Sequence, residues 1–122
     1  MIKRALKTKL NNSKVIFQGE TFDSKKELYR YLELRQLEKE GKISNLERQV
    51  KYELIPKQKL DGFVVERACN YIADFVYLDK SNLAIVVEDV KGYRDPNSAT
   101  YAKYVIKRKL MLHKYGIQIK EV

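Results

Sequence analysis

The sequence contains few of the residues on which several classes of protein depend. Its 122 residues include one cysteine, Cys69, and one histidine, His113. A single cysteine excludes an internal disulfide, and a structural zinc site requires several sulfur or imidazole ligands. No apolar run is long enough to span a bilayer, and the first residues lack the apolar segment and cleavage site of a signal peptide. We therefore expect a cytoplasmic protein without a zinc centre or a membrane span.

Acidic residues are clearly outnumbered by basic ones. The chain has 25 lysines and arginines against 16 aspartates and glutamates, which gives a formal net charge of +9. Such an excess in a small protein predicts an anionic partner, and nucleic acid is the commonest one. An anionic membrane surface is a second possibility, but no basic amphipathic helix with a bulky apolar face stands alone here. Charge that serves only solubility is the third.

The length fits one compact domain, over residues 15–122, preceded by a basic N-terminal arm over residues 1–14. Hydrophobic periodicity and capping residues predict the elements of this domain. They are a hairpin over 15–22, a helix over 24–40, strands within 50–54, 64–78 and 83–91, a helix over 99–115 and a strand from 117. The stretches 56–62 and 92–98 are predicted as loops. We expect an α/β fold with a mixed central sheet flanked by helices.

Glu27 is predicted to lie on the inward edge of the first helix. Ser24 followed three residues later by Glu27 matches a capping box. At about 100° per residue, Glu27 falls on the helical arc shared by Tyr31 and Leu34. Two roles therefore remain open for Glu27, which could complete the helix cap or belong to a functional site.

Two carboxylates and a lysine are expected to converge on the sheet. If the second and third strands form a hairpin with Asp74 opposite Val87, then Asp74, Asp89 and Lys91 share one otherwise apolar face, because strand side chains alternate. A shift of one residue would place Glu88 there instead. We prefer the first register because it also gathers the apolar residues of both strands, and we expect Glu88 to be a surface charge.

A divalent cation would explain these carboxylates. Burying a carboxylate without partners is costly, and two carboxylates near each other also repel. Mg²⁺ prefers oxygen ligands and usually takes one or two carboxylates together with water and substrate phosphates. Such an ion generates a hydroxide-like nucleophile and stabilises the leaving oxygen of a phosphodiester. We therefore expect Asp74 and Asp89 to bind Mg²⁺ or Mn²⁺, with Lys91 offsetting charge in the transition state.

The spacing of these residues resembles a known signature. Asp74, a gap of fourteen residues, and then Asp89-Val90-Lys91 resemble the acid, spacer, acid-x-lysine motif of the PD-(D/E)XK nuclease superfamily. The glutamate on the preceding helix and the order of the predicted elements match over about residues 20 to 120. The segments 22–27, 71–75 and 87–92 resemble small phage-borne nucleases, including Holliday-junction-resolvase-like proteins. Ala73 departs from the motif, which has proline in its name.

The resemblance implies a restriction-endonuclease-like αβββαβ core and roles for named residues. The implied metal ligands are Asp74, Asp89 and the Val90 carbonyl, with Lys91 as the catalytic lysine. Glu27 is implied as a further ligand or as the group that orients metal-bound water, and Gln49 resembles a glutamine near the site of some relatives. Resolving a four-way junction symmetrically needs two sites, so a homodimer is implied, working in the host cytoplasm if the protein is phage-encoded.

Further contacts with DNA are predicted from charge. Lys103 and Lys107 are four residues apart on one face of the second helix, where they could clamp phosphates. Arg94 follows the motif closely, and Gln49 could also touch DNA. The expected function is that of a metal-dependent DNA endonuclease, selective for branched DNA such as Holliday junctions. Two alternatives remain open, namely a nucleic-acid-binding module of this fold without catalysis and a non-catalytic interaction protein.

Overall fold

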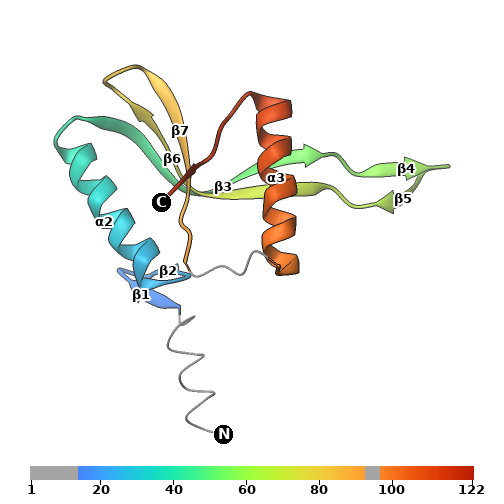
Figure 1. Ribbon diagram of the computed structural model, residues 1–122, viewed down its shortest axis with the longest axis horizontal. Coiled ribbons are helices and arrows are strands. Elements are labelled where there is room, and N and C mark those ends of the chain that lie inside the picture. Colours follow the sequence, from blue (N-terminus) through green and yellow to red (C-terminus); the bar gives the residue numbers. More distant parts are fainter. Residues whose placement is uncertain (1–13, 93–96) are drawn as a thin grey trace, which may run out of the picture.

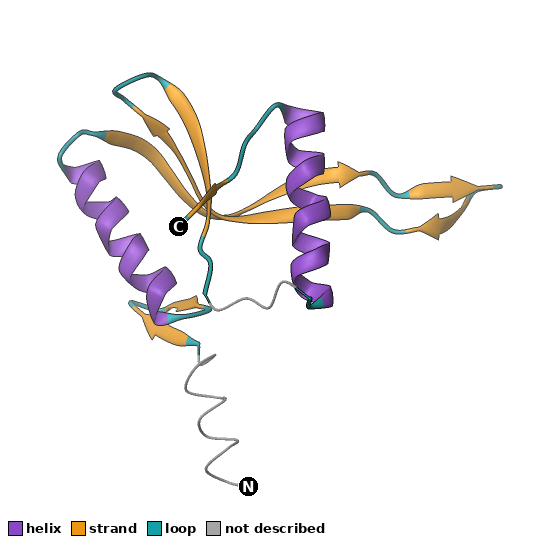
Figure 2. Ribbon diagram, in the orientation of Figure 1, coloured by secondary structure: helices purple, strands orange, loops and turns teal. Residues whose placement is uncertain are grey.

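Two helices and a mixed sheet form the structure, a computed structural model that describes residues 14–92 and 97–122 (Figures 1 and 2). The elements are β1 (Val15–Phe17), β2 (Glu20–Phe22), α2 (Lys25–Lys39), β3 (Ile43–Ile55), β4 (Gln58–Leu60), β5 (Phe63–Glu66), β6 (Cys69–Asp79), β7 (Ala84–Asp89), α3 (Ala99–Tyr115) and β8 (Lys120–Glu121). With the small hairpins β1–β2 and β4–β5 set aside, the order is helix, three strands, helix and strand. The predicted α/β class is confirmed.

The central sheet has the strand order β3-β6-β7-β8. Neighbouring strands are antiparallel except for β8, which runs parallel to β7, so the predicted mixed sheet is confirmed. Val76 lies opposite Val87, and the predicted register with Asp74 opposite Val87 is therefore wrong by two residues. The cause is Leu83, which joins the turn with a φ of 59° instead of beginning β7. An even shift preserves the alternation of side chains, so the pairing still brings Asp74 to the end of β7.

Helix α2 begins at the predicted cap. The Ser24 hydroxyl accepts a hydrogen bond from the Glu27 backbone N–H at 3.1 Å, and a Glu27 carboxylate oxygen accepts one from the Asp23 N–H at 3.0 Å. The two bonds satisfy N–H groups that have no partner within the helix. The core beside α2 consists of Phe22, Leu28, Tyr31, Leu34, Ile43, Phe75 and Tyr77.

Helix α3 covers a second core and has the predicted ends. The Ser98 hydroxyl accepts a hydrogen bond from the Tyr101 N–H at 3.1 Å, and Gly116 ends the helix with a φ of 67°. The core beside α3 consists of Leu54, Tyr71, Ala73, Val87, Tyr104, Met111 and Ile119. Within the described ranges, neither helix combines the length and apolar character needed to cross a membrane.

Strand β6 contributes to both cores. Tyr71 and Ala73 belong to the core beside α3, whereas Phe75 and Tyr77 belong to the core beside α2. Asp74 lies between these two pairs of buried residues in sequence, and Figure 1 shows α2 and α3 on either side of β6. A carboxylate therefore stands at the boundary between two apolar clusters.

Three predicted element boundaries are wrong, and the first is the start of β3, which lies at Ile43 and not near Val50. Residues 56–62, predicted as a polar loop, contain β4 and the turn of a hairpin with β5 (Figure 2). The hairpin is exposed on both faces, so it lacks the apolar alternation that marks a half-buried strand. The last strand was predicted from Ile117 but begins at Lys120, because the Ile117 N–H bonds back to the Met111 carbonyl and completes the helix end.

Glu88, predicted as a surface charge, is fully buried. Arg30 donates to its two carboxylate oxygens from Nε at 2.8 Å and from Nη2 at 2.6 Å, and the Tyr77 hydroxyl also donates to it. A carboxylate is tolerated in a core when it is paired and hydrogen-bonded in this way. The prediction failed because the partner lies 58 residues away in the sequence.

Removing Arg30 should destabilise the fold strongly. Arg30→Ala leaves the Glu88 carboxylate buried without its cation, and breaking a buried pair in this way costs about 3–5 kcal/mol. We expect the free energy of unfolding, measured by urea titration, to fall by that amount. The double variant Arg30→Met/Glu88→Leu should lose less unfolding free energy, because it removes both charges. Arg35→Ala, on the exposed side of α2, is the control. A loss of unfolding free energy below about 1 kcal/mol in Arg30→Ala would contradict a buried, stabilising Arg30–Glu88 pair.

Candidate active site

Asp74 lies in the middle of β6 and is bound through both carboxylate oxygens. Oδ2 accepts a hydrogen bond from the Val90 backbone N–H at 2.7 Å, and Oδ1 accepts one from Gln49 Nε2 at 3.3 Å. The first bond holds Asp74 against the end of β7, and the second ties it to β3. The position of this carboxylate is therefore determined by three strands of the sheet.

Gln49 joins Asp74 to Glu27. Its Nε2 also donates to Glu27 Oε1 at 3.0 Å, so one amide bridges carboxylates from β6 and α2. Gln49 has a φ of 53°, a left-handed conformation that is uncommon for a residue other than glycine. Such a conformation persists only where surrounding contacts favour it, and it is often found at functional sites. Here the bonds to the two carboxylates supply such contacts.

Glu27 has only 2% of its surface exposed, which confirms its predicted inward position. Oε2 completes the helix cap at Asp23, while Oε1 accepts from Gln49 and lies 3.5 Å from Arg48 Nη2. The Arg48 guanidinium in turn lies over the Phe22 ring, 3.7 Å from its centroid. One oxygen of Glu27 thus serves the cap, and the other belongs to the acidic group around Asp74.

Asp89 and Lys91 form an ion pair with 2.9 Å between Lys91 Nζ and Asp89 Oδ1. The Tyr71 hydroxyl donates to Asp89 Oδ2 at 2.7 Å, and Lys91 Nζ lies 3.0 Å from the centroid of the Tyr104 ring. The lysine is therefore held by an anion and by an aromatic face, both of which attract a cation. Asp89 is buried, with 8% of its surface exposed.

The backbone that carries Asp89 and Lys91 is fixed from two sides. The Val122 N–H donates to the Asp89 carbonyl at 3.0 Å, and the Lys91 N–H donates to the Val122 carbonyl at 2.8 Å. From α2, Lys26 Nζ donates to the Lys91 carbonyl. Residues 89–91 are thus held between the C-terminal segment and the first turn of α2.

Burial is the main electrostatic influence on Asp74. It raises the pKa of this carboxyl to about 6, and the negative charges of Glu27 and Asp89 act in the same direction. Hydrogen bonds from the Val90 N–H and from Gln49 lower the pKa and offset part of this effect. The buried carboxylates are therefore close enough for Glu27 and Asp89 to oppose ionisation of Asp74.

Comparison with known proteins places the chain in a family. Residues 7–121 match a family described as "Protein of unknown function (DUF1064)". The chain belongs to this family. Neither a search of curated proteins nor a search of solved structures found a match. All of the site residues described above except Val122 lie within the part of the chain that matches DUF1064.

The donor set of this DUF1064 chain suits a hard divalent cation. Asp74, Asp89, Glu27 and the Val90 carbonyl offer only oxygen, the ligand type that Mg²⁺ and Mn²⁺ prefer. Over residues 14–92 and 97–122, no three His, Cys, Asp or Glu side chains are placed together as ligands of one ion. One or two carboxylates suffice for Mg²⁺ when water and phosphate complete its shell. Because a carboxylate has about four lone-pair positions, the bound oxygens of Asp74 and Asp89 keep capacity for a cation.

The residues predicted to contact DNA are only partly described. Lys103 is exposed and Lys107 is half-buried on α3. Tyr104, between them in sequence, contacts Lys91, so the helix that carries the two lysines borders the site. Arg94 and residues 1–13 of the N-terminal basic arm lie outside the described residues.

Four residues that contact the candidate site were not predicted from the sequence. They are Lys26, Arg48, Tyr71 and Tyr104. The two tyrosines are among nine in the chain, and no local pattern separates them from the other seven. Arg48 and Lys26 each adjoin a predicted site residue in sequence, Gln49 and Glu27. Lys26 and Tyr71 also fall in segments 22–27 and 71–75, which carry the nuclease resemblance, but neither signal assigned them a role.

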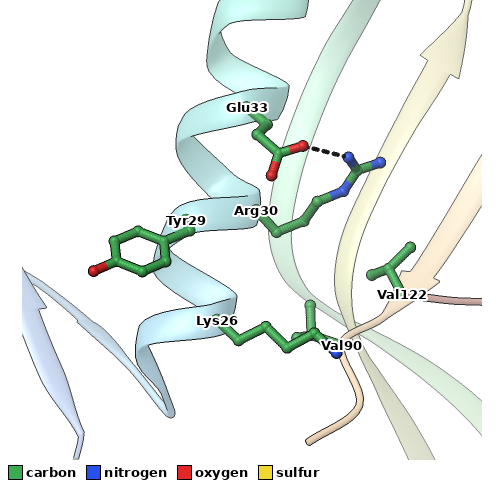
Figure 3. A pocket seen from close by; sticks show the side chains of 6 residues that line it. All are labelled: Lys26, Tyr29, Arg30, Glu33, Val90 and Val122. Atoms are coloured by element: carbon green, nitrogen blue, oxygen red, sulfur yellow. Dashed lines mark hydrogen bonds and ion pairs between the residues drawn. The ribbon is translucent and has the colours of Figure 1, made fainter.

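A pocket of about 490 Å³ adjoins the site at Val90. It is lined by Lys26, Tyr29, Arg30, Glu33, Val90 and Val122. Figure 3 shows Lys26 reaching towards Val90, Arg30 bonded to Glu33, and the Tyr29 ring pointing away from the other side chains. The pocket therefore has the aliphatic parts of cationic side chains and apolar walls at the end of β7, and the ring of Tyr29 does not point into it.

Asp74 should make the protein less stable at neutral pH than at acidic pH. Its pKa is about 6 in the fold against an ordinary value of 3.8, so the native state binds the proton more tightly. This contribution is fully present below about pH 4 and is lost as the pH rises through 6, a change of up to about 3 kcal/mol. Urea titrations in EDTA should show Asp74→Asn gaining stability relative to wild type between about pH 4 and pH 7.5.

Asp79→Asn, at the C-terminal end of β6, is the matched control. Hydrogen bonds from Ser81 lower the pKa of Asp79, so its small effect should have the opposite sign. If the difference in unfolding free energy between wild type and Asp74→Asn did not change with pH, the pKa of Asp74 would not be raised in the fold.

Proposed function

We propose that this DUF1064 chain is a metal-dependent endonuclease that hydrolyses phosphodiester bonds in DNA. The proposal is supported chiefly by the acids around Asp74. Gln49 links Asp74 to Glu27, the negative charge of Asp89 acts on Asp74, and Asp89 forms an ion pair with Lys91. Carboxylates gathered in this way repel one another until a cation neutralises them. The net charge of +9 supplies long-range attraction for an anionic polymer.

The proposed roles follow from the contacts of each side chain. Asp74, Asp89 and the Val90 carbonyl would hold Mg²⁺ or Mn²⁺, and Glu27 would be a further ligand or orient the attacking water. When bound, such an ion lowers the pKa of water and stabilises the leaving oxygen of a phosphodiester. Lys91, which Asp89 holds through its ion pair, would offset the negative charge that develops on the phosphate.

The order of elements supports a PD-(D/E)XK nuclease core. Helix α2, strands β3, β6 and β7, helix α3 and strand β8 follow the order that the sequence resemblance implies. The acid-x-lysine motif stands at the end of β7, beside the strand that carries the first acid. Under this proposal the central sheet is a restriction-endonuclease-like core in which Ala73 takes the place of the motif's proline.

Branched DNA, such as a Holliday junction, is the proposed substrate. The described residues contain no second domain that could read a base sequence, so selection by DNA structure suits the chain better. Lys103 and Lys107 on α3, with Gln49 and Arg94, are the proposed contacts to DNA, supported by the N-terminal basic arm. A homodimer would provide the two sites that symmetric resolution of a four-way junction requires.

A nucleic-acid-binding module without catalysis is the second candidate. The observation that favours it is the completeness of the hydrogen bonding, since both oxygens of Asp74 and of Asp89 already have donors. A network of this kind satisfies buried polar groups without any cation. The two candidates differ in whether the acids are needed for cutting, which the following experiment measures.

Cleavage of DNA should require the two central acids and the lysine. Plain duplex, flap and four-way-junction DNA are incubated with wild type, Asp74→Ala, Asp89→Asn and Lys91→Ala in Mg²⁺. Removing a group that stabilises the transition state typically lowers the rate about 10²- to 10³-fold, so cutting should fall at least that far while binding survives. Asp79→Asn is the control and should cut normally. Wild-type binding without cutting in Mg²⁺ or Mn²⁺ would favour the binding module.

Mg²⁺ should also stabilise the folded protein through the same acids. An ion that binds only the native state adds about 1 kcal/mol at a concentration several times its Kd, which corresponds to a Tm increase of a few degrees. We expect this increase above about pH 7, where Asp74 is ionised, and a much smaller one in Asp74→Asn. Asp79→Asn should respond like wild type. An equal Mg²⁺ response in all three proteins would place the ion elsewhere.

A further inference from the structure

Strands β4 and β5 form a two-stranded ribbon that extends beyond the central sheet (Figure 1). All seven strand residues of this β4–β5 ribbon are exposed, and among the described residues its strands pair only with each other. Its apolar side chains are nonetheless large, with Leu60 68% and Phe63 76% exposed. An apolar group left in water in this way often marks a contact surface.

A two-residue turn defines the tip of the ribbon. Leu60 and Phe63 lie directly opposite each other, joined by Asp61 and Gly62 with φ values of 52° and 83°. Two successive positive φ angles are typical of the type I′ turn, the connection that best fits the twist of a two-residue hairpin. Opposing residues share a face, so the ribbon presents a leucine and a phenylalanine together at its end.

Both edges of the ribbon are protected against pairing with another strand. The β4 edge carries Lys59 between the exposed residues Gln58 and Leu60, and lysines on an edge disfavour strand addition. On β5, Val64 and Glu66 pair with Lys59 and Gln58, which leaves Val65 as an extra residue in a bulge. A bulge bends an edge strand and interrupts its ladder. These features disfavour pairing of the ribbon with a strand of a second copy of the chain.

We infer that the tip of the β4–β5 ribbon is an apolar wedge that stacks on unpaired or unstacked bases of branched DNA. Aromatic side chains stack on any exposed base, and apolar wedges insert between base steps that are already weakened. Continuous duplex offers few such bases, whereas a branch point exposes them. The inference rests on the proposed function for its choice of DNA as the partner.

The charges and the reach of the ribbon agree with this partner. The exposed cations Lys57, Lys59 and Arg67 outnumber the acids Asp61 and Glu66 along the stretch, which allows phosphates to approach. The chain path from Asp74 along β6 and β5 to Phe63 spans up to about 35 Å at the rise of a strand. This is about one turn of duplex DNA, so the wedge and the acids could contact one bound branch together.

Binding measured without divalent metal tests the inference apart from cleavage. In EDTA, the Kd for a four-way junction and for plain duplex of equal length is measured for wild type and Phe63→Ala. Loss of one base–aromatic stack should weaken junction binding about tenfold and leave duplex binding within about twofold. Fluorescence of 2-aminopurine at the branch point should change when wild type binds and change less with the variant.

Two further variants provide matched controls. Val64→Ala removes a half-exposed apolar residue next to Phe63 in sequence and should bind both DNAs normally, because strand alternation points it to the other face of the ribbon. Phe63→Trp retains a stacking ring and should preserve junction binding. Phe63 makes no contact with either core, so the Tm of these variants should match wild type.

The possible results separate the wedge from its rivals and from the nuclease. Unchanged junction binding in Phe63→Ala, or an equal loss on junction and duplex, would exclude a wedge selective for branches. A change from dimer to monomer in light scattering would identify a second copy of the chain as the occupant. Selective loss of junction binding, in a protein that cuts no DNA in Mg²⁺, would support the wedge and reject the nuclease. Cutting that depends on Asp74, together with normal junction binding by Phe63→Ala, would support the nuclease and reject the wedge.

Discussion

A carboxylate that leaves water must find hydrogen-bond donors or a cation, and Glu27, Asp74 and Asp89 all do so in one region of this molecule. Their donors come from a backbone N–H after β7, an amide on β3 and a hydroxyl on β6. Helix α2, three strands and the C-terminal segment are thereby oriented around the same acids. The backbone of Gln49 even adopts a left-handed conformation where its amide bridges two of them.

Strand β6 explains why these acids can be close without sharing one core. Asp74 lies between the buried residues that β6 contributes to the α3 core and those that it contributes to the α2 core, and it belongs to neither cluster. We call this boundary the seam. Glu27 approaches the seam from the α2 side, and Asp89 approaches from the side where Tyr71 and Tyr104 lie. The seam is therefore a place where charge can be buried while both cores remain apolar.

The parts of the fold that could be predicted depend on local chemistry. The caps at Ser24, Ser98 and Gly116, and the inward face of Glu27, follow from neighbours within one helical turn. The register of β6 and β7 could not be fixed, because one residue in the turn moves every pair. The burial of Glu88 could not be predicted because it depends on Arg30 from a distant helix. The contacts of Tyr71 and Tyr104 with the site likewise depend on packing between remote segments.

Glu88 and Asp89 are adjacent in sequence but differ in how fully their charge is compensated. Glu88 has a two-point arginine partner and a tyrosine, which satisfy its charge within the fold. Asp89 has one lysine, and none of the ion pairs among the described residues involves Asp74, whose ionisation is opposed by burial. Asp74 is thus the least compensated of these acids, in a protein whose overall charge is strongly positive. Under the proposed function, the surplus positive charge would draw a polyanion to the surface by long-range attraction, while a small cation would bind at the acids that the polyanion itself could not approach. Metal and DNA would then each lower the electrostatic cost of binding the other, which is why the acids and the surplus lysines belong to a single proposal.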